Sequence, residues 1–452
     1  MSYRREYQEK LTTAEQAVAN VKSGDSVKIG YFNGKPVELI KALAKRHEEL
    51  KDVLIVACAT VPPIPEVIQY PESFIYQDWH WSKLTRILRT HYDNIIYAPI
   101  CYHMCCDFII KKEVNEGKDI DWCWQRVGPM DKNGYFNFGT TNSESLTSFS
   151  MATNKCVEVN KNVPTCLGGN QEAIHISMID SIIEAPDDQL MLSAPDVPAP
   201  TKVELQLAEH LIKFIHDGSC IQLGIGGLPN ALGTVLKDTD IKDLGVHSEM
   251  FVDAYVDMID SGQINGSKKN IDKYKASYTF AIGTQHMYDW MHENPAIASY
   301  SVDYINDPRI IAQQDNMISI NQALQVDLYT QISAESMGTN HITGNGGMTD
   351  FILGAQWSKD GKSIVCLPST HTNKEGNVES RIVPTFKTGT CVTVSRHLVD
   401  YIATEYGVRK MKAQNQWVRT EGLIELAHPD FRDDLIKQAN DLKIWTRTNK
   451  ID

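Results

Sequence analysis

Short apolar runs alternate along the chain with segments whose apolar residues recur every three or four positions. The apolar runs include Val53–Ala57, Asn94–Tyr97 and Ser363–Leu367, and their length and polar flanks predict buried strands. The segments between them predict amphipathic helices. This alternation favours an α/β fold whose largely parallel sheets are flanked by helices, because parallel strands need crossover connections.

Two segments repeat the same order of features, one over residues 21–46 and the other over residues 215–238. Each predicts a strand, a glycine-containing turn, a proline and a helix. A capping-box pattern precedes each, at Thr13–Gln16 and at Thr201–Glu204. Two unrelated strand–turn–helix units would give the same pattern, so a duplication is one of two interpretations.

The length of 452 residues favours two domains. A proline-rich connector at residues 195–201 marks the boundary. We therefore predict two similar α/β domains, at residues 1–194 and 202–452, joined by this linker.

A glycine-rich turn and an isolated glutamate stand close together in the second half. The turn, Gly224-Ile225-Gly226-Gly227, follows a predicted strand at Cys220–Leu223, and Pro229 is expected to open the next helix. Glycines let a backbone approach a ligand and direct its N–H groups at an anion. Glu249 follows among apolar residues, where a carboxylate is either satisfied structurally or active.

A second glycine cluster occupies residues 343–350, after a strand-like stretch at Val326–Thr330. A surface turn would explain this cluster equally well. Together with the first turn and the loop residue Lys374, it favours a site for a long anionic ligand.

Composition excludes several classes of protein. The net charge of −13 argues against nucleic-acid binding, which needs clustered Lys and Arg. The first residues lack an apolar signal core and no run is long enough to span a bilayer, so we expect a cytoplasmic protein without membrane contact. Ten scattered cysteines then predict reduced thiols.

Other motifs fail on inspection. Pro229 stands where a dinucleotide fingerprint needs its third glycine. The group Cys101, His103, Cys105 and Cys106 lacks the paired spacing of zinc sites, and buried thiols in a helix or loop explain it better. We expect no bound metal. The lysines between Lys268 and Lys275 predict a solvated face rather than a binding patch.

The chemistry of such a site follows from its parts. A carboxylate attacks an activated acyl group to form a covalent intermediate. With a thioester substrate, this attack releases a thiolate. The thiolate then attacks the carboxyl carbon of the glutamate, and the enzyme becomes a glutamyl thioester. Backbone N–H groups at Gly226 and Gly227 would stabilise the oxyanion formed in each step, at about 3–4 kcal/mol per donor.

The chain resembles the acetyl-CoA hydrolase/transferase family, whose transferases form a glutamyl–CoA thioester. The matching stretches cover nearly the whole chain and include GPMDKNGYFNFG from Gly128, CLGGNQEAIHIS from Cys166, LGIGGLPNALG from Leu223 and LGVHSEMFVDAYVD from Leu244. Within the family the chain looks most like bacterial butyryl-CoA:acetate and 4-hydroxybutyrate CoA-transferases.

This resemblance implies a function for individual residues. It makes Glu249 the nucleophile and places Asn306 beside it as active-site support. It assigns coenzyme A binding and the oxyanion to Gly224, Ile225, Gly226, Gly227, Leu228, Leu324, Gly347 and Lys374. Coenzyme A is then a substrate and transient adduct rather than a tightly bound cofactor. The partners implied are acyl-CoA, short carboxylates and further copies of the chain in a homodimer or homotetramer.

The segment His103–Cys106 departs from the family pattern, where a Ser-Glu-rich loop follows a tyrosine. We expect this segment to border the acyl group, and its apolar side chains favour butyryl over 4-hydroxybutyryl groups. An acyl-CoA hydrolase using the same glutamate and a non-catalytic CoA-binding module are the alternatives.

Overall fold

The computed structural model describes residues 2–194, 199–224 and 226–446. Its contacts divide the chain into two compact units, Met1–Pro195 with Ser277–Ile305, and Asp196–Ala276 with Asn306–Asp452. Of the predicted linker, residues 195–198 lie outside the described residues.

The second unit differs from the continuous domain predicted at residues 202–452, because Ser277–Ile305 belongs to the first unit. Backbone hydrogen bonds hold this segment there: the Ala281 N–H donates to the Thr140 carbonyl over 2.8 Å, and the Asn142 N–H donates to the Thr279 carbonyl over 3.2 Å.

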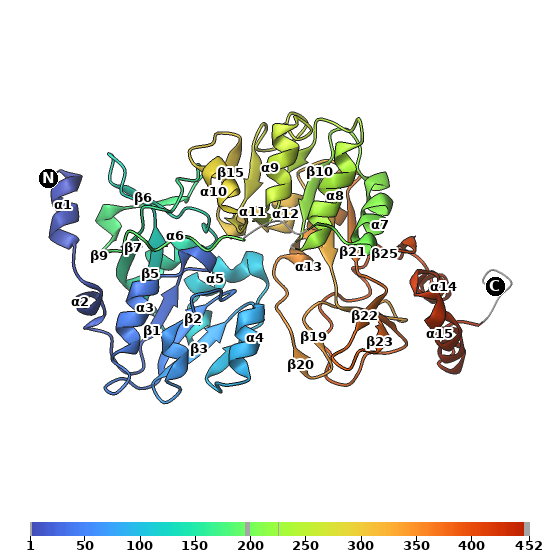
Figure 1. Cartoon of the computed structure of the whole chain (residues 1–452), viewed down its shortest axis with the longest axis horizontal. Coiled ribbons are helices and arrows are strands. Elements are labelled where there is room, and N and C mark those ends of the chain that lie inside the picture. The colour runs from blue at the N-terminus through green and yellow to red at the C-terminus, as the bar shows by residue number, and fades with distance from the viewer. Residues whose placement is uncertain (1, 195–198, 225, 447–452) are drawn as a thin grey trace. The chain divides into compact units, whose positions relative to one another are not determined.

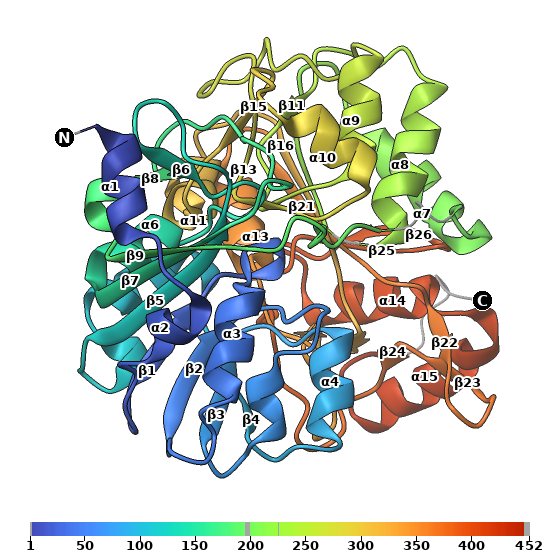
Figure 2. The same cartoon turned by 60° about the vertical axis from the view of Figure 1, so that its left-hand side comes forward.

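The first unit is built on one seven-stranded sheet in the order β4-β3-β2-β1-β5-β7-β9, and every neighbouring pair is parallel. Figure 2 shows α3 lying in front of β1 and β2. The strands of this sheet are β1 (Ser26–Ile29), β2 (Val53–Ala57), β3 (Phe74–Asp78), β4 (Ile95–Tyr97), β5 (Ile120–Val127), β7 (Ala152–Val159) and β9 (Ser181–Glu184). The helices of the unit are α1 (Tyr3–Lys10), α2 (Ala14–Val18), α3 (Val37–Ala44), α4 (Lys83–Arg89), α5 (Cys105–Ile110), α6 (Ser145–Met151), α10 (Gln285–Met291) and α11 (Val302–Ile305).

A buried carboxylate occupies the N-terminus of α3. Glu158, on β7, accepts the N–H groups of Val37 over 3.0 Å, Glu38 over 2.8 Å and Leu39 over 3.2 Å. Burial raises the pKa of Glu158 to about 7, although Arg126 opposes the shift. The donors left unpaired in the first turn of this helix are therefore satisfied by the chain itself.

The second unit is built on a six-stranded sheet in the order β11-β10-β16-β21-β25-β26. All pairs are parallel except β25 with β26. Figure 1 shows α8 and α9 side by side next to this sheet. The strands are β10 (Cys220–Leu223), β11 (Gly245–Val246), β16 (Met317–Gln322), β21 (Lys362–Cys366), β25 (Tyr401–Thr404) and β26 (Gly407–Lys410). The helices are α7 (Lys202–Leu211), α8 (Gly227–Lys237), α9 (Asp253–Asp260), α12 (Pro308–Ile311), α13 (Met348–Trp357), α14 (Gln416–Leu426) and α15 (Pro429–Asp441).

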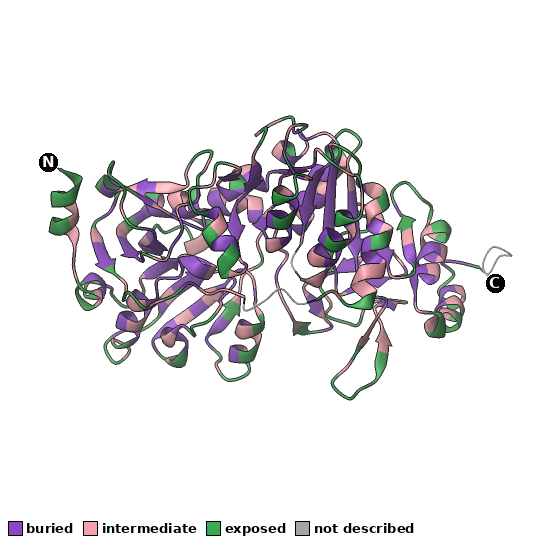
Figure 3. Cartoon of the chain, turned by 45° about the horizontal axis from the view of Figure 1, so that its top comes forward, coloured by how far each residue is buried: buried purple, intermediate pink, exposed green. Residues whose placement is uncertain are grey.

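Short pairs of strands complete both units. They include β6 (Tyr135–Asn137) with β8 (Ala173–His175), β13 (Ala276–Tyr278) with β15 (Ile297–Ser299), and β22 (Thr370–Thr372) with β23 (Val378–Ser380). In Figure 3 the central strands are mostly buried and the exposed residues lie on outer helix turns and loops. The prediction of two helix-flanked, largely parallel sheets is confirmed.

The repeated strand–turn–helix pattern corresponds to β1 with α3 and to β10 with α8. Both predicted capping boxes are formed, at Thr13 before α2 and at Thr201 before α7. β1 and β10 each lie inside their sheet, with parallel neighbours on both sides. Each sheet thus contains one strand–turn–helix unit of the repeated pattern.

All ten cysteines are free thiols. Cys105 and Cys106 are buried in the first turn of α5, as expected for thiols inside a helix. No helix among the described residues combines the length and apolarity needed to cross a membrane.

Candidate active site

The glycine-rich turn connects β10 directly to the N-terminus of α8. Gly226 is exposed and caps the helix with φ 110° and ψ −164°, a backbone conformation that favours glycine. Ile225 lies outside the described residues. The first N–H groups of α8 have no acceptor within the helix and attract negative charge.

Pro229 does not open this helix, contrary to expectation, because α8 begins two residues earlier, at Gly227. A proline is tolerated there since N–H groups of the first turn need no helical partner. Leu228, in the first turn of α8, is only 3% exposed, so the structure buries this predicted ligand contact. A Cβ on Gly227 would lie 2.1 Å from Glu204 Oε1, so this glycine also serves the packing of α7 on α8.

Glu249 lies at the same edge of the sheet as the glycine-rich turn. β10 and β11 are parallel neighbours, and Glu249 follows β11 by three residues. Ligands of open α/β sheets bind beyond the carboxyl ends of the strands. The sequence prediction that placed the turn and the glutamate in one region agrees with this topology.

Three groups surround the Glu249 carboxylate. Asn306 Nδ2 donates to Glu249 Oε2 over 2.6 Å, and the Gly347 N–H also bonds to the carboxylate. Asn306 Nδ2 lies 3.3 Å from Asp350 Oδ2. Glu249 keeps part of its surface accessible, but its carboxylate is deep enough that desolvation raises the pKa of Glu249 to about 8. The negative charge of Asp350 adds to this shift, and the Asn306 and Gly347 hydrogen bonds oppose it.

Gly347 must be small because the carboxylate lies against it. A Cβ at this position would come within 2.0 Å of Glu249 Oε2 and 2.3 Å of Asn306 Nδ2. Its φ of −91° is ordinary, so space rather than backbone conformation requires the glycine. The second glycine cluster is therefore the N-terminal approach to α13, and it contacts the glutamate directly.

Among the described residues, no hydrogen bond or ion pair joins the predicted residues Leu324 and Lys374 to the Glu249 carboxylate. Leu324 follows β16 and is partly buried, but its N–H donates to Ser333 and its carbonyl accepts Arg381, both over 2.9 Å. Lys374 lies exposed in the turn between β22 and β23, and no described residue forms a hydrogen bond or ion pair with its side chain.

The sequence analysis missed one residue near the glutamate and misplaced another. Asp350 lies inside the glycine cluster at residues 343–350, but its proximity to the Glu249 carboxylate leaves no signal in the local sequence. Lys269, expected on a solvated face, is 2% exposed, because its ammonium donates to the carbonyls of Val246 and Lys275.

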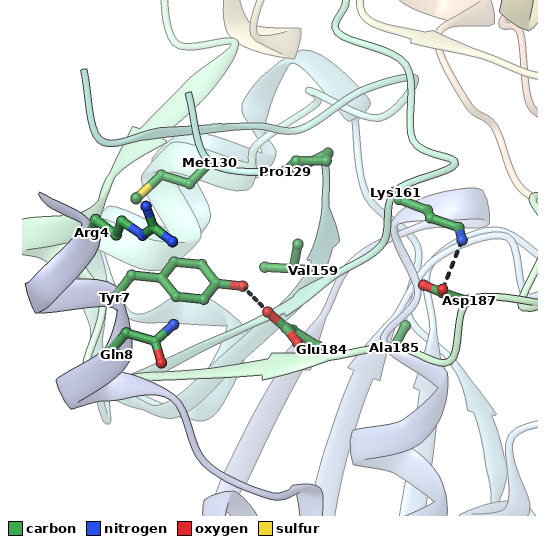
Figure 4. Close-up of a pocket in the computed structure, with 10 residues that line it drawn as sticks. All are labelled: Arg4, Tyr7, Gln8, Pro129, Met130, Val159, Lys161, Glu184, Ala185 and Asp187. Atoms are coloured by element: carbon green, nitrogen blue, oxygen red, sulfur yellow. Dashed lines mark hydrogen bonds and ion pairs between the residues drawn. The ribbon is translucent and has the colours of Figure 1, made fainter. Parts of the chain in front are cut away.

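A separate hollow lies on the first unit (Figure 4). Two pairs of its polar side chains interact: Tyr7 donates to Glu184 over 2.8 Å, and Lys161 pairs with Asp187 over 2.9 Å. None of its lining residues belongs to the predicted site. They are Arg4, Tyr7, Gln8, Pro129, Met130, Val159, Lys161, Glu184, Ala185 and Asp187.

Two family models match this chain. The acetyl-CoA hydrolase/transferase N-terminal domain matches residues 1–192, and the C-terminal domain matches residues 283–439. The chain belongs to the acetyl-CoA hydrolase/transferase family. A butyryl-CoA:acetate CoA-transferase of Anaerostipes caccae is 44% identical over all of both chains.

Further members of the family agree in sequence and in fold. A 4-hydroxybutyrate coenzyme A transferase of Clostridium kluyveri is 38% identical over 97% of this chain and 99% of its own. The crystal structure of RipA from Yersinia pestis superposes with a TM-score of 0.88 at 34% identity, covering 98% of this chain and 100% of that one. The protein is thus a CoA-transferase of this family.

Proposed function

We propose that this CoA-transferase moves CoA between butyryl-CoA and acetate through a thioester on Glu249. The observation that carries the proposal is the setting of Glu249: its partly buried carboxylate lies beyond β11, beside the turn that opens α8, and accepts the Asn306 amide over 2.6 Å. The name of the Anaerostipes caccae relative, identical at 44% over the full length, supports the choice of substrates.

The first half-reaction begins when the Glu249 carboxylate attacks the thioester carbonyl of butyryl-CoA. The C–S bond breaks, and CoA thiolate leaves behind a butyryl–glutamyl anhydride. The thiolate then attacks the glutamyl carbonyl carbon, butyrate departs with the bridging oxygen, and the enzyme holds a glutamyl–CoA thioester.

The second half-reaction repeats these steps with acetate. An acetate oxygen attacks the glutamyl carbonyl and expels CoA thiolate, giving an acetyl–glutamyl anhydride. The thiolate attacks the acetyl carbonyl, so that acetyl-CoA leaves and the Glu249 carboxylate is restored. Over the whole reaction one thioester bond is broken and one is formed, and no net proton, electron or phosphate is consumed.

Each residue of the site has a task in these steps. Asn306 holds Oε2, so that Oε1 is the oxygen directed at the substrate, and the Gly347 N–H adds a further bond to the carboxylate. The open N–H groups at the start of α8 would stabilise the oxyanions, as helix N-termini do for anionic ligands. Asp350 keeps the carboxylate from being over-stabilised as an anion, which would weaken it as a nucleophile.

Acyl preference rests on the segment at His103–Cys106. Cys105 and Cys106 are buried, so if the segment borders the acyl group, the half-buried Met104 supplies its apolar contact and His103 is its one polar side chain. We propose that Met104 faces the acyl chain and leaves a hydroxyl on it without a partner. An unpaired buried hydroxyl costs about 1–3 kcal/mol, so butyryl-CoA should exceed 4-hydroxybutyryl-CoA in kcat/KM. A tenfold preference for the hydroxylated substrate would move the assignment to 4-hydroxybutyrate.

One assay separates the candidate functions. Purified protein is mixed with butyryl-CoA, with and without acetate, and acetyl-CoA and free CoA are followed. Acetate-dependent acetyl-CoA supports transfer, acetate-independent CoA release identifies a hydrolase, and neither product identifies a CoA-binding module. Borohydride added after acyl-CoA should reduce the thioester and inactivate the wild type, whereas Glu249→Ala should form no adduct. An active Glu249→Ala enzyme would refute the role of Glu249.

A further inference from the structure

β16 ends in an exposed glutamine beside the glycine-rich turn. Gln322 is the last residue of this strand, and the five residues before it are buried. A Cβ placed on Gly226 would lie 3.4 Å from Gln322 Nε2 and 3.8 Å from Gln322 Oε1. Since these are ordinary contact distances, the carboxamide of Gln322 lies alongside the backbone that caps α8.

This carboxamide has no hydrogen-bond partner within the described part of the chain. Two neighbouring amide side chains, on β10 and β16, are engaged instead: Gln222 Oε1 accepts Asn321 Nδ2 over 3.2 Å and Ser319 Oγ over 2.8 Å. Gln222, Ser319 and Asn321 are all buried, as expected for amides and hydroxyls that bond to one another. Gln322 therefore presents an N–H donor to solvent at the start of α8.

Gln322 and Glu249 lie on opposite sides of the glycine-rich turn. The strand order is β11-β10-β16, so the turn after β10 stands between Glu249, which follows β11, and Gln322, which ends β16. The three strands are parallel, and their carboxyl ends share one edge of the sheet. Neighbouring strands lie about 4.8 Å apart, which puts β11 and β16 on the order of 10 Å apart. That distance leaves room for a thioester beyond the turn.

The backbone of Gln322 is fixed by the sheet. Gln322 pairs with Cys366 in the ladder of β16 with β21, and the N–H of Ala323 donates to the Cys366 carbonyl over 2.9 Å. On the other side, the N–H of Gly224 donates to the Ile320 carbonyl over 3.0 Å, which ties the start of the turn to β16. A donor placed on a strand needs little reorganisation when charge develops next to it.

We propose that Gln322 is a further catalytic residue, whose carboxamide N–H donates to the oxyanion formed when Glu249 attacks the thioester. Gln322 shares this anion with the first N–H groups of α8. The proposal rests on the function proposed above, because only a thioester that reacts with Glu249 brings its carbonyl oxygen to this turn. A neutral amide suits the task, since it stabilises the developing charge without forming an ion pair with the Glu249 carboxylate.

The test compares Gln322→Met with a matched control, Gln414→Met. Gln414 is also an exposed glutamine of the second unit, but it follows β26, at the opposite edge of the sheet from β11. Methionine keeps the length of the side chain and removes the N–H donor. We expect Gln322→Met to lower kcat and the single-turnover rate of thioester formation by about 100-fold, with KM for butyryl-CoA changed by less than about threefold. The control should keep both constants.

A second variant tests the charge that Gln322 faces. Gln322→Glu keeps the shape of the side chain but places a carboxylate next to the oxyanion, so it should be slower than Gln322→Met. A Gln322→Glu enzyme that is faster than Gln322→Met would overturn the proposal. So would a Gln322→Met enzyme whose only change is a higher KM, because that result identifies a contact with an unreactive part of CoA.

Borohydride trapping distinguishes failure of this proposal from failure of the proposed function. If wild type forms no trapped adduct, the glutamyl thioester itself is refuted. If wild type and Gln322→Met form the adduct at the same rate, only the role of Gln322 is refuted.

Discussion

At the scale of single residues, the site is controlled by the ionisation of one carboxylate. Desolvation raises the pKa of Glu249 to about 8, while Asn306 and Gly347 donate hydrogen bonds that favour its charged form. A nucleophile must be deprotonated, and one that holds its charge weakly is more reactive. The surroundings of Glu249 therefore set both how much carboxylate is present and how readily it attacks.

The first consequence concerns the pH dependence of the reaction. Since Glu249 acts as the anion, kcat/KM for butyryl-CoA should rise about tenfold per pH unit below its pKa and level off above it. An initial-rate profile between about pH 6 and pH 9 measures this. A flat profile would show that Glu249 is ionised throughout that range.

Two substitutions should move this profile in opposite directions. Asn306→Ala removes a hydrogen bond to the anion, so the profile should shift to higher pH and the rate near neutrality fall about 100-fold. Asp350→Asn removes a neighbouring negative charge, so the profile should shift to lower pH. Shifts of the same sign in both variants would contradict the assignment of these contacts.

The same carboxylate should make the folded protein less stable as the pH rises from about 4.5 to about 8. Between the usual glutamate pKa, about 4.5, and about 8, the folded chain holds a proton that the unfolded chain has lost, so stability falls as pH rises. Glu249→Gln should relieve this, with a gain over wild type that grows by about 1–3 kcal/mol across the window, allowing for partial exposure. Urea unfolding at both ends of the window checks it, and an equal difference at both would contradict it.

At the scale of elements, two helix N-termini meet the candidate site by different means. The turn before α8 leaves exposed backbone at Gly226, whose φ of 110° requires glycine. The start of α13 needs Gly347 for space instead, because the Glu249 carboxylate lies against it.

Gly347→Ala should therefore displace the carboxylate without straining the backbone. A shift of about 1 Å in a reacting group costs about 100-fold in rate, so kcat should fall by that order while the protein remains folded. Gly233→Ala in α8 is the control, since its Cβ would meet Ala254 at an ordinary 3.7 Å and alanine favours helix. Activity in Gly347→Ala equal to that control would show that the carboxylate can move freely.

Local sequence patterns predicted helices and strands better than they predicted contacts between distant residues. The strands at Val53–Ala57 and Cys220–Leu223 and both capping boxes appear as predicted, because periodicity and capping are properties of a few adjacent residues. The stretch Val326–Thr330 gave only a short strand, β17 (Gln325–Asp327). Asp350 was missed, since its importance depends on Glu249 and Asn306, which lie far away in the sequence.

At the scale of the whole molecule, the sequence predicted two similar α/β domains but not how the chain is shared between them. The segment Ser277–Ile305 returns to the first unit through backbone bonds to residues 140–143. Bonds between unrelated backbone segments leave no periodic pattern, so a proline-rich boundary was the only signal available. The likeness of β1–α3 to β10–α8 could be read from the sequence, because both units contain a glycine turn and a proline.

Those two equivalent helices differ in what occupies their N-termini. In α3 the place is taken by Glu158, whose carboxylate accepts three N–H groups, whereas the first turn of α8 begins at the exposed Gly226. The first half of the chain thus carries a built-in mimic of the anion that the second half is proposed to bind. Although the chain has two similar halves, we expect it to hold a single reactive centre. Exhaustive trapping with labelled acyl-CoA should therefore saturate at one CoA ester per chain, and the first half would serve as scaffold.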